Sequence, residues 1–301
     1  MQLEQVADEI REVARSPVQH TLPGFRLAPQ AKPFLKWAGG KTRLLDAILP
    51  HVPARMADFH EPFLGSGAVF FAVEHRIAGR AHLGDLNDQL INAWSQVRND
   101  VRGLLDGLER YRGLDREEDY YEVREAAPAD PLQRATRFVY LNQTAWNGLW
   151  RENKQGVFNV PWGDRPFRGL DVEATVAVSR VLRRAEIRQR DFRQALADAK
   201  AGDFVYLDPP YLPISDTSKF SGYTGKRFRL ADLVDLSEAC RELSERGVAW
   251  MMSNRDNARM RELFSHAKVI PFTTWRSVSA QNRRNVEPAA SPEVIVVGGP
   301  T

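Results

Sequence analysis

Cysteine is nearly absent from this chain of 301 residues, which carries only Cys240. A single thiol excludes an internal disulfide framework and a zinc site built from several cysteines, and it fits a reducing cytoplasm. The six histidines are scattered, and none falls in the H-E-x-x-H spacing of a zinc site. The sequence therefore predicts no metal site.

Long apolar runs are also missing. No stretch approaches the roughly 18 apolar residues that a membrane-spanning helix needs, and residues 1–14 are acidic rather than apolar, so we expect no signal peptide and no membrane partner. Hydrophobic residues make up 43% of the chain and charged residues 27%, as in an ordinary globular protein. The net charge of +3 permits a polyanionic partner without identifying one. We expect a cytoplasmic protein.

The stretch Phe-Val-Tyr-Leu-Asp-Pro-Pro-Tyr at residues 204–211 stands out among what is present. Its first four residues read as a short buried strand, which Pro209 ends because proline has no N–H to donate to a sheet. Pro209 and Pro210 stiffen the corner that follows. This corner offers an acceptor in Asp208 and a flat ring in Tyr211, which suits an amine on an aromatic heterocycle. The alternative is a plain Pro-Pro turn with a capping aspartate.

A glycine turn lies between a predicted strand and a predicted helix in the first third of the chain. Gly65 and Gly67 form this turn, which is typical of the first unit of a nucleotide-binding βαβ fold, although Phe70 stands where the third glycine of G-x-G-x-x-G would be. The next predicted strand, 81–87, contains Asp85, which is placed to accept hydrogen bonds from ribose hydroxyls. Together these features predict a cofactor site.

Gly39, Gly40 and Lys41 open another predicted helix, which stops at Pro50. Two glycines allow a ligand to approach the backbone closely. The G-x-x-x-x-G-K-[ST] spacing is absent, so we do not expect a nucleoside triphosphate site. The alternative is a plain helix start anchored by Trp37.

The chain changes character over residues 88–172. Helical patterns run through 88–110, 117–126 and 131–142. A stretch rich in Asn, Gly and aromatic residues follows, with a predicted hairpin turn at 153–156. Its aromatic residues are Trp146, Trp150, Phe158 and Trp162. This segment favours a recognition module; the alternative is a cap packed over the core.

Strands alternate with helices through the rest of the chain, which predicts a mostly parallel α/β sheet. We expect a helix from Val172 and a strand that ends at Asp191. The later predicted elements are strands 248–254, 268–272 and 294–297 and helices 230–246 and 256–266, with loops at 212–229 and 276–292, the second basic. Ahead of them we expect a short amphipathic helix at 1–16 and an extended linker at 17–33.

Seven motifs occur in a characteristic order: F-L-K-W-A-G-G-K (34–41), E-P-F-L-G-S-G-A-V-F (61–70), G-D-L-N (84–87), L-N-Q-T-A-W-N-G-L-W-R (141–151), G-V-F-N-V-P-W-G (156–163), D-P-P-Y (208–211) and S-N-R-D (253–256). This ordered set resembles the Dam family of DNA adenine-N6 methyltransferases (D12 class, alpha group), which use S-adenosylmethionine (AdoMet). The resemblance covers roughly residues 33–297. The leader is longer than in compact members, and E-P-A-A-S-P (287–292) is an apparent insertion.

The resemblance implies an α/β fold, a Rossmann-like AdoMet-dependent methyltransferase sheet closed by an antiparallel strand, with an inserted, mainly helical target-recognition domain carrying a β-hairpin. It implies an N-terminal extension at 1–30, a catalytic domain formed by 31–87 and 173–301, and the target-recognition domain at 88–172. The positions that line the AdoMet site correspond to Trp37, Lys41, Asp85 and Asp208, with Glu61, Phe63, Gly65 and Gly67 beside its methionine part and Asp191 and Phe192 beside its adenine.

The same resemblance implies methyl transfer to N6 of an adenine flipped out of double-stranded DNA. Asp208 and the Pro209 carbonyl would accept the amino hydrogens, and Tyr211 would stack on the base. The expected DNA-binding residues are Trp146, Asn147, Leu149, Arg151, Pro161 and Arg276. Arginine matches guanine O6 and N7, so the expected target is GATC or a longer site containing GAT. We expect a monomer that needs no metal, with a cognate restriction endonuclease as a further candidate partner.

Three alternatives remain open at this point. The first is methylation of cytosine N4. A serine at position 208 would favour that reaction, whereas the aspartate present there favours adenine. A Rossmann oxidoreductase using NAD would explain Gly65, Gly67 and Asp85 but leaves the D-P-P-Y corner without a role. A DNA-binding protein that has lost catalysis is the third, and the intact corner argues against it.

Overall fold

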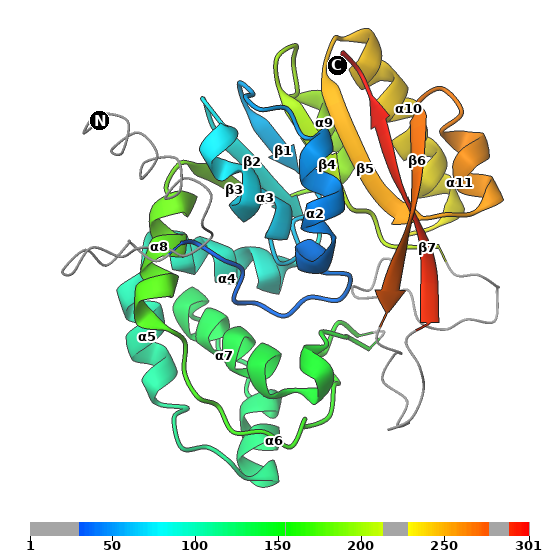
Figure 1. Ribbon diagram of the computed structural model, residues 1–301. Helices are drawn as coiled ribbons and strands as arrows, with labels where there is room; N and C mark the ends of the chain where they lie inside the picture. Colours follow the sequence, from blue (N-terminus) through cyan, green and yellow to red (C-terminus); the bar gives the residue numbers. More distant parts are fainter. Residues whose placement is uncertain (1–29, 154, 213–227, 277–288, 301) are drawn as a thin grey trace, which may run out of the picture.

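The fold is built on one seven-stranded sheet with helices on both faces (Figure 1). A computed structural model describes residues 30–153, 155–212, 228–276 and 289–300. The strands are β1 (Phe59–Glu61), β2 (Ala81–Asp85), β3 (Ala185–Gln189), β4 (Phe204–Leu207), β5 (Ala249–Arg255), β6 (Lys268–Arg276) and β7 (Ala289–Gly298). Their order is β3-β2-β1-β4-β5-β7-β6. The expected mixed α/β class and the closing antiparallel strand are therefore confirmed.

Strands β1 to β5 pair in parallel, and β7 pairs antiparallel with both β5 and β6. The chain runs outward from β1 through β2 to β3 and then returns to place β4 on the other side of β1. Strand order reverses at this point, and ligands of open α/β sheets bind beside the carboxyl ends of the strands there. This topology predicts a ligand-binding site at the carboxyl ends of β1 and β4.

The two faces of β4 show why its sequence is apolar throughout. Phe204 and Tyr206 belong to the core under one layer of helices, whereas Val205 and Leu207 belong to the core under the other. A parallel strand covered on both faces loses the alternation of apolar and polar residues. All four side chains are buried, as the sequence predicts.

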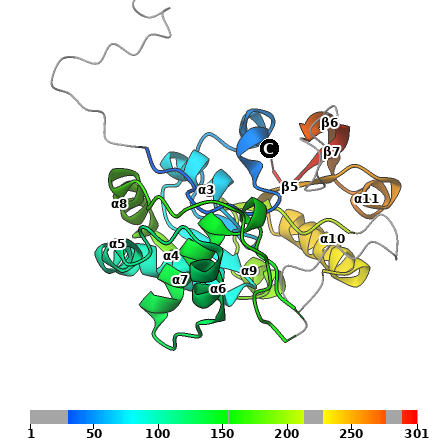
Figure 2. The ribbon, with the colours of Figure 1, turned by 90° about the horizontal axis from the view of Figure 1, so that it is seen from below.

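The helices are α2 (Leu45–Ile48), α3 (Ala68–Val73), α4 (Asp88–Asn99), α5 (Val101–Glu109), α6 (Glu117–Glu125), α7 (Pro131–Thr144), α8 (Val172–Leu182), α9 (Phe192–Ala197), α10 (Leu230–Glu245) and α11 (Ala258–Leu263). They divide between these two layers and a helical body, α5 to α7, whose buried side chains join the same core as β1 and β2. Short 3₁₀ turns occupy Lys41–Leu44, Leu49–His51, Glu74–Arg76 and Trp146–Gly148. Helices α5, α6 and α7 gather below the sheet in Figure 1, and Figure 2 shows this body from below.

Helix α4 links the helical body to the sheet. It contacts β2 and β3 on one side and α7 on the other. The helical pattern over 88–110 forms two helices, because Asp100 ends α4 and its side chain caps α5 by accepting from the Gly103 N–H. The segment from α4 to α7 is thus mainly helical and lies between two strands of one sheet in chain order.

Several element boundaries differ from those expected. The helix predicted after Lys41 is broken into a 3₁₀ turn, α2 and a second 3₁₀ turn that includes Pro50. The strand expected to end at Asp191 ends at Gln189, because the Asp191 side chain caps α9. Strands β6 and β7 are longer than predicted. The predicted helix at 1–16 and most of the loops at 212–229 and 276–292 lie outside the described residues.

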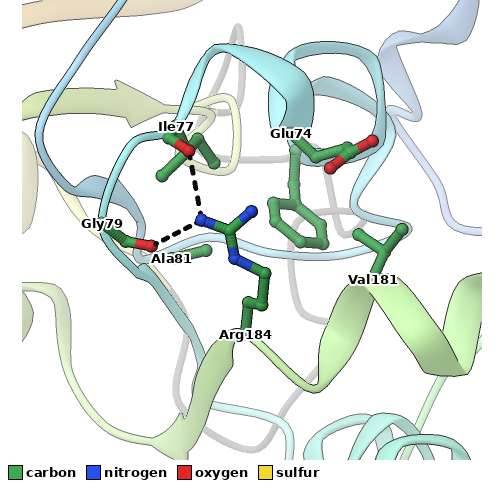
Figure 3. A pocket seen from close by; sticks show the side chains of 7 residues that line it. Glu74, Ile77, Gly79, Ala81, Val181 and Arg184 are labelled. Atoms are coloured by element: carbon green, nitrogen blue, oxygen red, sulfur yellow. Dashed lines mark hydrogen bonds between the residues drawn. The ribbon is translucent and has the colours of Figure 1, made fainter.

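A small cavity lies between α8 and the segment that follows α3 (Figure 3). Its volume is about 10 Å³, which is room for at most one water molecule. The Arg184 guanidinium donates to the carbonyls of Ile77 and Gly79 at its edge. We therefore assign this cavity to packing. No helix in the described part of the chain is long and apolar enough to cross a membrane.

Candidate active site

Three carboxyl groups gather at the carboxyl ends of neighbouring strands. Glu61 ends β1, Asp85 ends β2 and Asp208 directly follows β4. Because these strands are adjacent and parallel, their ends lie at one edge of the sheet. The structure therefore brings together carboxylates that are far apart in the sequence.

Asp208 lies at the centre of a hydrogen-bond network. Its Oδ1 accepts from the buried Lys41 ammonium at 2.5 Å and from the Ser253 hydroxyl at 3.5 Å. Lys41 also donates to the Gly39 carbonyl at 2.8 Å, and the Ser253 hydroxyl bonds to the Tyr206 hydroxyl at 2.8 Å. This network fixes the orientation of the Asp208 carboxylate, whose side chain remains 21% exposed.

Burial raises the pKa of all three carboxyl groups, that of Asp85 included. The pKa of Asp208 is raised by desolvation, which outweighs the opposing effect of the Lys41 ammonium. Desolvation, together with the nearby Asp208, raises the pKa of Glu61 well above its usual value. Glu61 Oε2 also accepts from the Phe70 N–H at 3.2 Å. Three carboxyl groups thus face one ammonium at this edge, and a cationic ligand bound beside them would favour their ionised forms.

The glycine turn is built as the sequence predicts. Gly65 has a φ of +48° and Gly67 a φ of +69°, in the left-handed region that favours glycine. A Cβ atom added at Gly65 would lie 2.7 Å from Cδ1 of Trp37, so the indole contacts the turn directly. The Asp85 carboxylate accepts from the N–H groups of Gly65, at 3.1 Å, and Asn87, at 3.0 Å.

The corner after β4 presents the side chains expected there. Pro209 is buried and Pro210 is exposed. The half-buried Tyr211 donates its hydroxyl hydrogen bond to Glu293 Oε2 at 2.8 Å. The Lys41 ammonium lies 5.6 Å from the centroid of the Tyr211 ring.

Phe192 and Asp191, expected beside the adenine of the cofactor, have internal partners in the structure. The Phe192 ring is 3% exposed and stacks on Phe63 with a centroid distance of 5.6 Å. The Asp191 carboxylate caps α9 and accepts from the Arg193 guanidinium. Phe228 contacts both rings of the stacked pair. The three rings form one aromatic cluster that includes Phe63 of the segment leading into the glycine turn.

The predicted hairpin forms, but as isolated bridges rather than as two continuous strands. Glu152 pairs with Phe158 and Ala145 with Trp162. The Asn153 carbonyl accepts from the Gly156 N–H at the expected turn.

Two of the four aromatic residues of this hairpin, Trp150 and Phe158, lie in the packed cap that the sequence left open as the alternative. Both are buried, because their rings stack on each other at 4.4 Å and Trp150 also packs on Phe138 at 4.3 Å. Trp146 remains 42% exposed.

The expected DNA-binding side chains lie on or beside the hairpin. Asn147 has a φ of +53° and is exposed next to Trp146. The exposed Arg151 donates to the Asn159 side chain at 2.8 Å and to its carbonyl at 3.1 Å, which orients the guanidinium. The remaining predicted residues of this group are Leu149, which is half-buried, and Pro161, which is exposed. Arg276 ends β6, and its side chain lies outside what the structure describes.

The sequence did not predict a set of hydrogen bonds that joins the end of α7 to the segment leading to Lys41. The buried Asn142 side chain accepts from the Lys36 N–H at 2.9 Å and donates to the Lys36 carbonyl at 2.6 Å. Gln143 donates to the Phe34 carbonyl at 2.8 Å. Two of the motifs quoted above thus contact each other. Trp94, whose indole N–H donates to the Gly65 carbonyl at 3.1 Å, was also missed.

No group of His, Cys, Asp and Glu side chains within the described ranges could hold a metal ion. The lone Cys240 is buried in α10. The chemistry available at the site is therefore that of oriented carboxylates, backbone carbonyls, hydroxyls and one buried ammonium.

Comparison with known proteins agrees with this geometry. The family model for D12 class N6 adenine-specific DNA methyltransferases matches residues 37–278. A type II methyltransferase of Lactococcus lactis subsp. cremoris is 33% identical over 83% of this chain and 90% of its own length. A type II methyltransferase of Methanocaldococcus jannaschii is 36% identical over 80% of this chain and 91% of its own.

A third relative is named a DNA adenine methylase rather than a type II methyltransferase. The DNA adenine methylase of Escherichia coli (strain K12) is 33% identical over 82% of this chain and 89% of its own length. The family model and these relatives span both the carboxylate-bearing strand ends and the hairpin. The chain therefore belongs to the D12 class of N6 adenine-specific DNA methyltransferases.

Proposed function

We propose that this enzyme transfers a methyl group from AdoMet to N6 of an adenine flipped out of double-stranded DNA, in GATC or a longer site containing GAT. The observation that carries this proposal is the orientation of Asp208 at the end of β4, where Lys41 and Ser253 hold one carboxylate oxygen. Tyr211 lies three residues further along the same rigid corner. An acceptor beside a flat ring is what an exocyclic amine on a purine requires.

The residues at the strand ends fit AdoMet. Glu61, Asp85 and Asp208 provide three carboxyl groups against the single ammonium of Lys41. In their ionised forms these carboxyl groups complement a sulfonium ion and the ammonium of its methionine part, and the bound cation in turn favours those ionised forms. Trp37 and the glycine turn provide a flat wall and a close backbone approach. When bound, AdoMet supplies an activated methyl carbon, so the protein's task is orientation and electrostatics.

Each residue of the corner has a distinct role in this proposal. Asp208 Oδ1 carries the bonds from Lys41 and Ser253, so Oδ2 is the oxygen that accepts from the adenine amine. The Pro209 carbonyl accepts the second amino hydrogen, which directs the nitrogen lone pair at the methyl carbon. Pro210 keeps the backbone rigid, and Tyr211 stacks on the base. Stacking offsets part of the few kcal/mol that flipping costs.

We assign the segment 88–172 to target recognition. Its hairpin carries Trp146, an exposed ring of a size to fill the space that a flipped base leaves, and Arg151, which Asn159 orients. Arginine pairs with guanine through two hydrogen bonds in the major groove. The relatives include both type II methyltransferases and DNA adenine methylases, so a cognate endonuclease remains a candidate partner of this enzyme. We propose that the enzyme acts as a monomer.

Replacing Glu61 with glutamine tests the carboxylate cluster. The folded-state pKa of Glu61 is raised above its unfolded value, so the protonated form adds stability at low pH and this is lost as pH rises through the folded pKa. We expect the Glu61→Gln protein to unfold at a higher temperature than wild type near about pH 8, with the difference shrinking toward about pH 5. AdoMet affinity should fall about tenfold, since the neutral amide cannot become the carboxylate that would attract the positively charged cofactor.

Thermal unfolding across this pH range and calorimetry with AdoMet give both readouts. Glutamine keeps an oxygen that can accept from the Phe70 N–H, so the comparison isolates the charge. A variant that is less stable than wild type at every pH, or that binds AdoMet normally, would remove Glu61 from the cluster.

The target site is tested with duplexes that carry every single substitution of GATC. We expect each wrong base pair to lower the methylation rate about 10–100-fold in wild type. Arg151→Ala should relax discrimination at one position, by about 1–3 kcal/mol. The matched control is Arg102→Ala on α5, whose side chain is 92% exposed.

Two outcomes of this panel contradict the assignment. Equal methylation of substituted sites by wild type would exclude GATC as the target. If Arg151→Ala instead slows all duplexes alike and reduces the salt dependence of binding, Arg151 contacts phosphate and does not read a base.

A further inference from the structure

Strand β7 contributes a buried carboxylate to the catalytic corner that the proposed chemistry does not use. Glu293 is 1% exposed and lies on the antiparallel strand between β5 and β6. Its Oε2 accepts from the Tyr211 hydroxyl at 2.8 Å, and its Oε1 accepts from the Ser291 hydroxyl at 3.3 Å. Burying a carboxylate is costly unless hydrogen bonds compensate it. A glutamate at this position therefore indicates a specific task.

The partner that Glu293 holds is the ring assigned to base stacking. Pro209 and Pro210 restrict the backbone before Tyr211, but they leave its side-chain torsions free to rotate. The hydroxyl at the far end of the ring is the group through which a neighbour can fix the ring plane. The Tyr211 hydroxyl donates to Glu293 Oε2 at 2.8 Å, a normal length for an O–H···O hydrogen bond. Glu293 is therefore placed to hold the Tyr211 ring in one orientation before substrate binds.

We propose that Glu293 is a positioning residue that fixes the plane of the Tyr211 ring for stacking on the flipped adenine. This inference rests on the proposed function. Glu293 acts through Tyr211 and touches neither substrate in this assignment. Its loss slows methyl transfer from a bound complex by a larger factor than it weakens AdoMet binding, because the contacts of Trp37, Asp85 and the glycine turn remain and Glu293 reaches the cofactor site only through its charge effect on Asp208.

A double-mutant cycle tests this assignment. We expect Glu293→Ala and Tyr211→Phe each to slow single-turnover methylation of a GATC duplex about 10–100-fold. The double variant should be no slower than the slower single variant by more than about threefold, because both changes break the same bond. Glu293→Gln should stay within about tenfold of wild type, since the amide oxygen can still accept from the hydroxyl.

If Glu293 only stabilised the fold, its variants would lower the unfolding temperature without slowing methylation by the folded protein. The control is Ser237→Ala on α10, which removes a 2.7 Å hydrogen bond from the Ser237 hydroxyl to the carbonyl of Leu263, the last residue of α11. It should lower the unfolding temperature without slowing methylation. Glu293→Gln and Tyr211→Phe keep the test decisive if Glu293→Ala fails to fold.

Three results would overturn the inference: a normal rate in Glu293→Ala, rate losses that multiply in the double variant, or a loss of AdoMet affinity in Glu293→Gln equal to its loss of rate. The Asp208→Ala variant measured alongside separates this failure from that of the proposed function. If Asp208→Ala is inactive while Glu293→Ala is normal, the positioning role alone is wrong. If Asp208→Ala stays active, the proposed function is wrong as well.

Discussion

Replacing Asp208 with alanine should abolish methyl transfer, lowering the rate by about 10³-fold or more. In the proposed mechanism the carboxylate is the acceptor that orients the adenine amine, and no other carboxylate among the described residues follows β4 at the corner. AdoMet affinity should weaken as well, because the negative charge near the sulfonium is reduced. Single-turnover methylation of a GATC duplex and calorimetry with AdoMet measure the two effects separately.

The Asp208→Ala variant also leaves the Lys41 ammonium buried without its partner. Removing one member of a buried ion pair costs about 3–5 kcal/mol of stability, so a loss of activity could come from unfolding. The double variant Lys41→Met/Asp208→Ala removes both charges and should regain stability while remaining inactive. A folded Asp208→Ala protein with near-normal turnover would refute the assigned role of Asp208.

Replacing Gly65 with alanine should lower AdoMet affinity about 100-fold. An added Cβ would lie 2.7 Å from Cδ1 of Trp37, so the indole must move off the turn that we propose as part of the AdoMet site. The left-handed φ of +48° adds a strain of about 1–2 kcal/mol for an alanine. The displaced turn would also disturb the hydrogen bond from the Gly65 N–H to Asp85. Calorimetric titration with AdoMet measures this loss.

Gly113 provides a matched control for backbone strain alone. Its φ is +89°, and a Cβ atom added there would meet nothing within 4 Å. Gly113→Ala should therefore lose stability without losing AdoMet affinity. Equal affinity losses in the two variants, or normal AdoMet binding by Gly65→Ala, would show that the contact between Trp37 and the turn is not part of the cofactor site.

Features carried by local sequence were predicted well. The strand before Asp208, the glycine turn and the strand that ends with Asp85 each depend on a few consecutive residues whose backbone preferences agree. Parallel strands separated by helices place their carboxyl ends at one edge. The meeting of Glu61, Asp85 and Asp208 therefore follows from the order of the elements, without knowledge of any side-chain contact.

Features that depend on partners distant in sequence were not predictable in the same way. The hydrogen bond between Lys36 and Asn142 joins residues 106 positions apart, and the hydrogen bond between Tyr211 and Glu293 joins residues 82 positions apart. No spacing rule connects such pairs. The buried state of Trp150 was likewise left open, because an aromatic residue in a predicted hairpin can face either solvent or core. Packing against Phe138 decides that it faces the core.

Identification of the methylated nucleoside tests the central claim most directly. Plasmid DNA lacking methylation is incubated with the purified protein and AdoMet, digested to nucleosides and analysed by mass spectrometry, with the Lys41→Met/Asp208→Ala protein as the control. We predict that wild type produces N6-methyldeoxyadenosine and that the control produces none. The appearance of N4-methyldeoxycytidine instead, or of no methylated nucleoside with a protein that binds both AdoMet and DNA, would contradict this account.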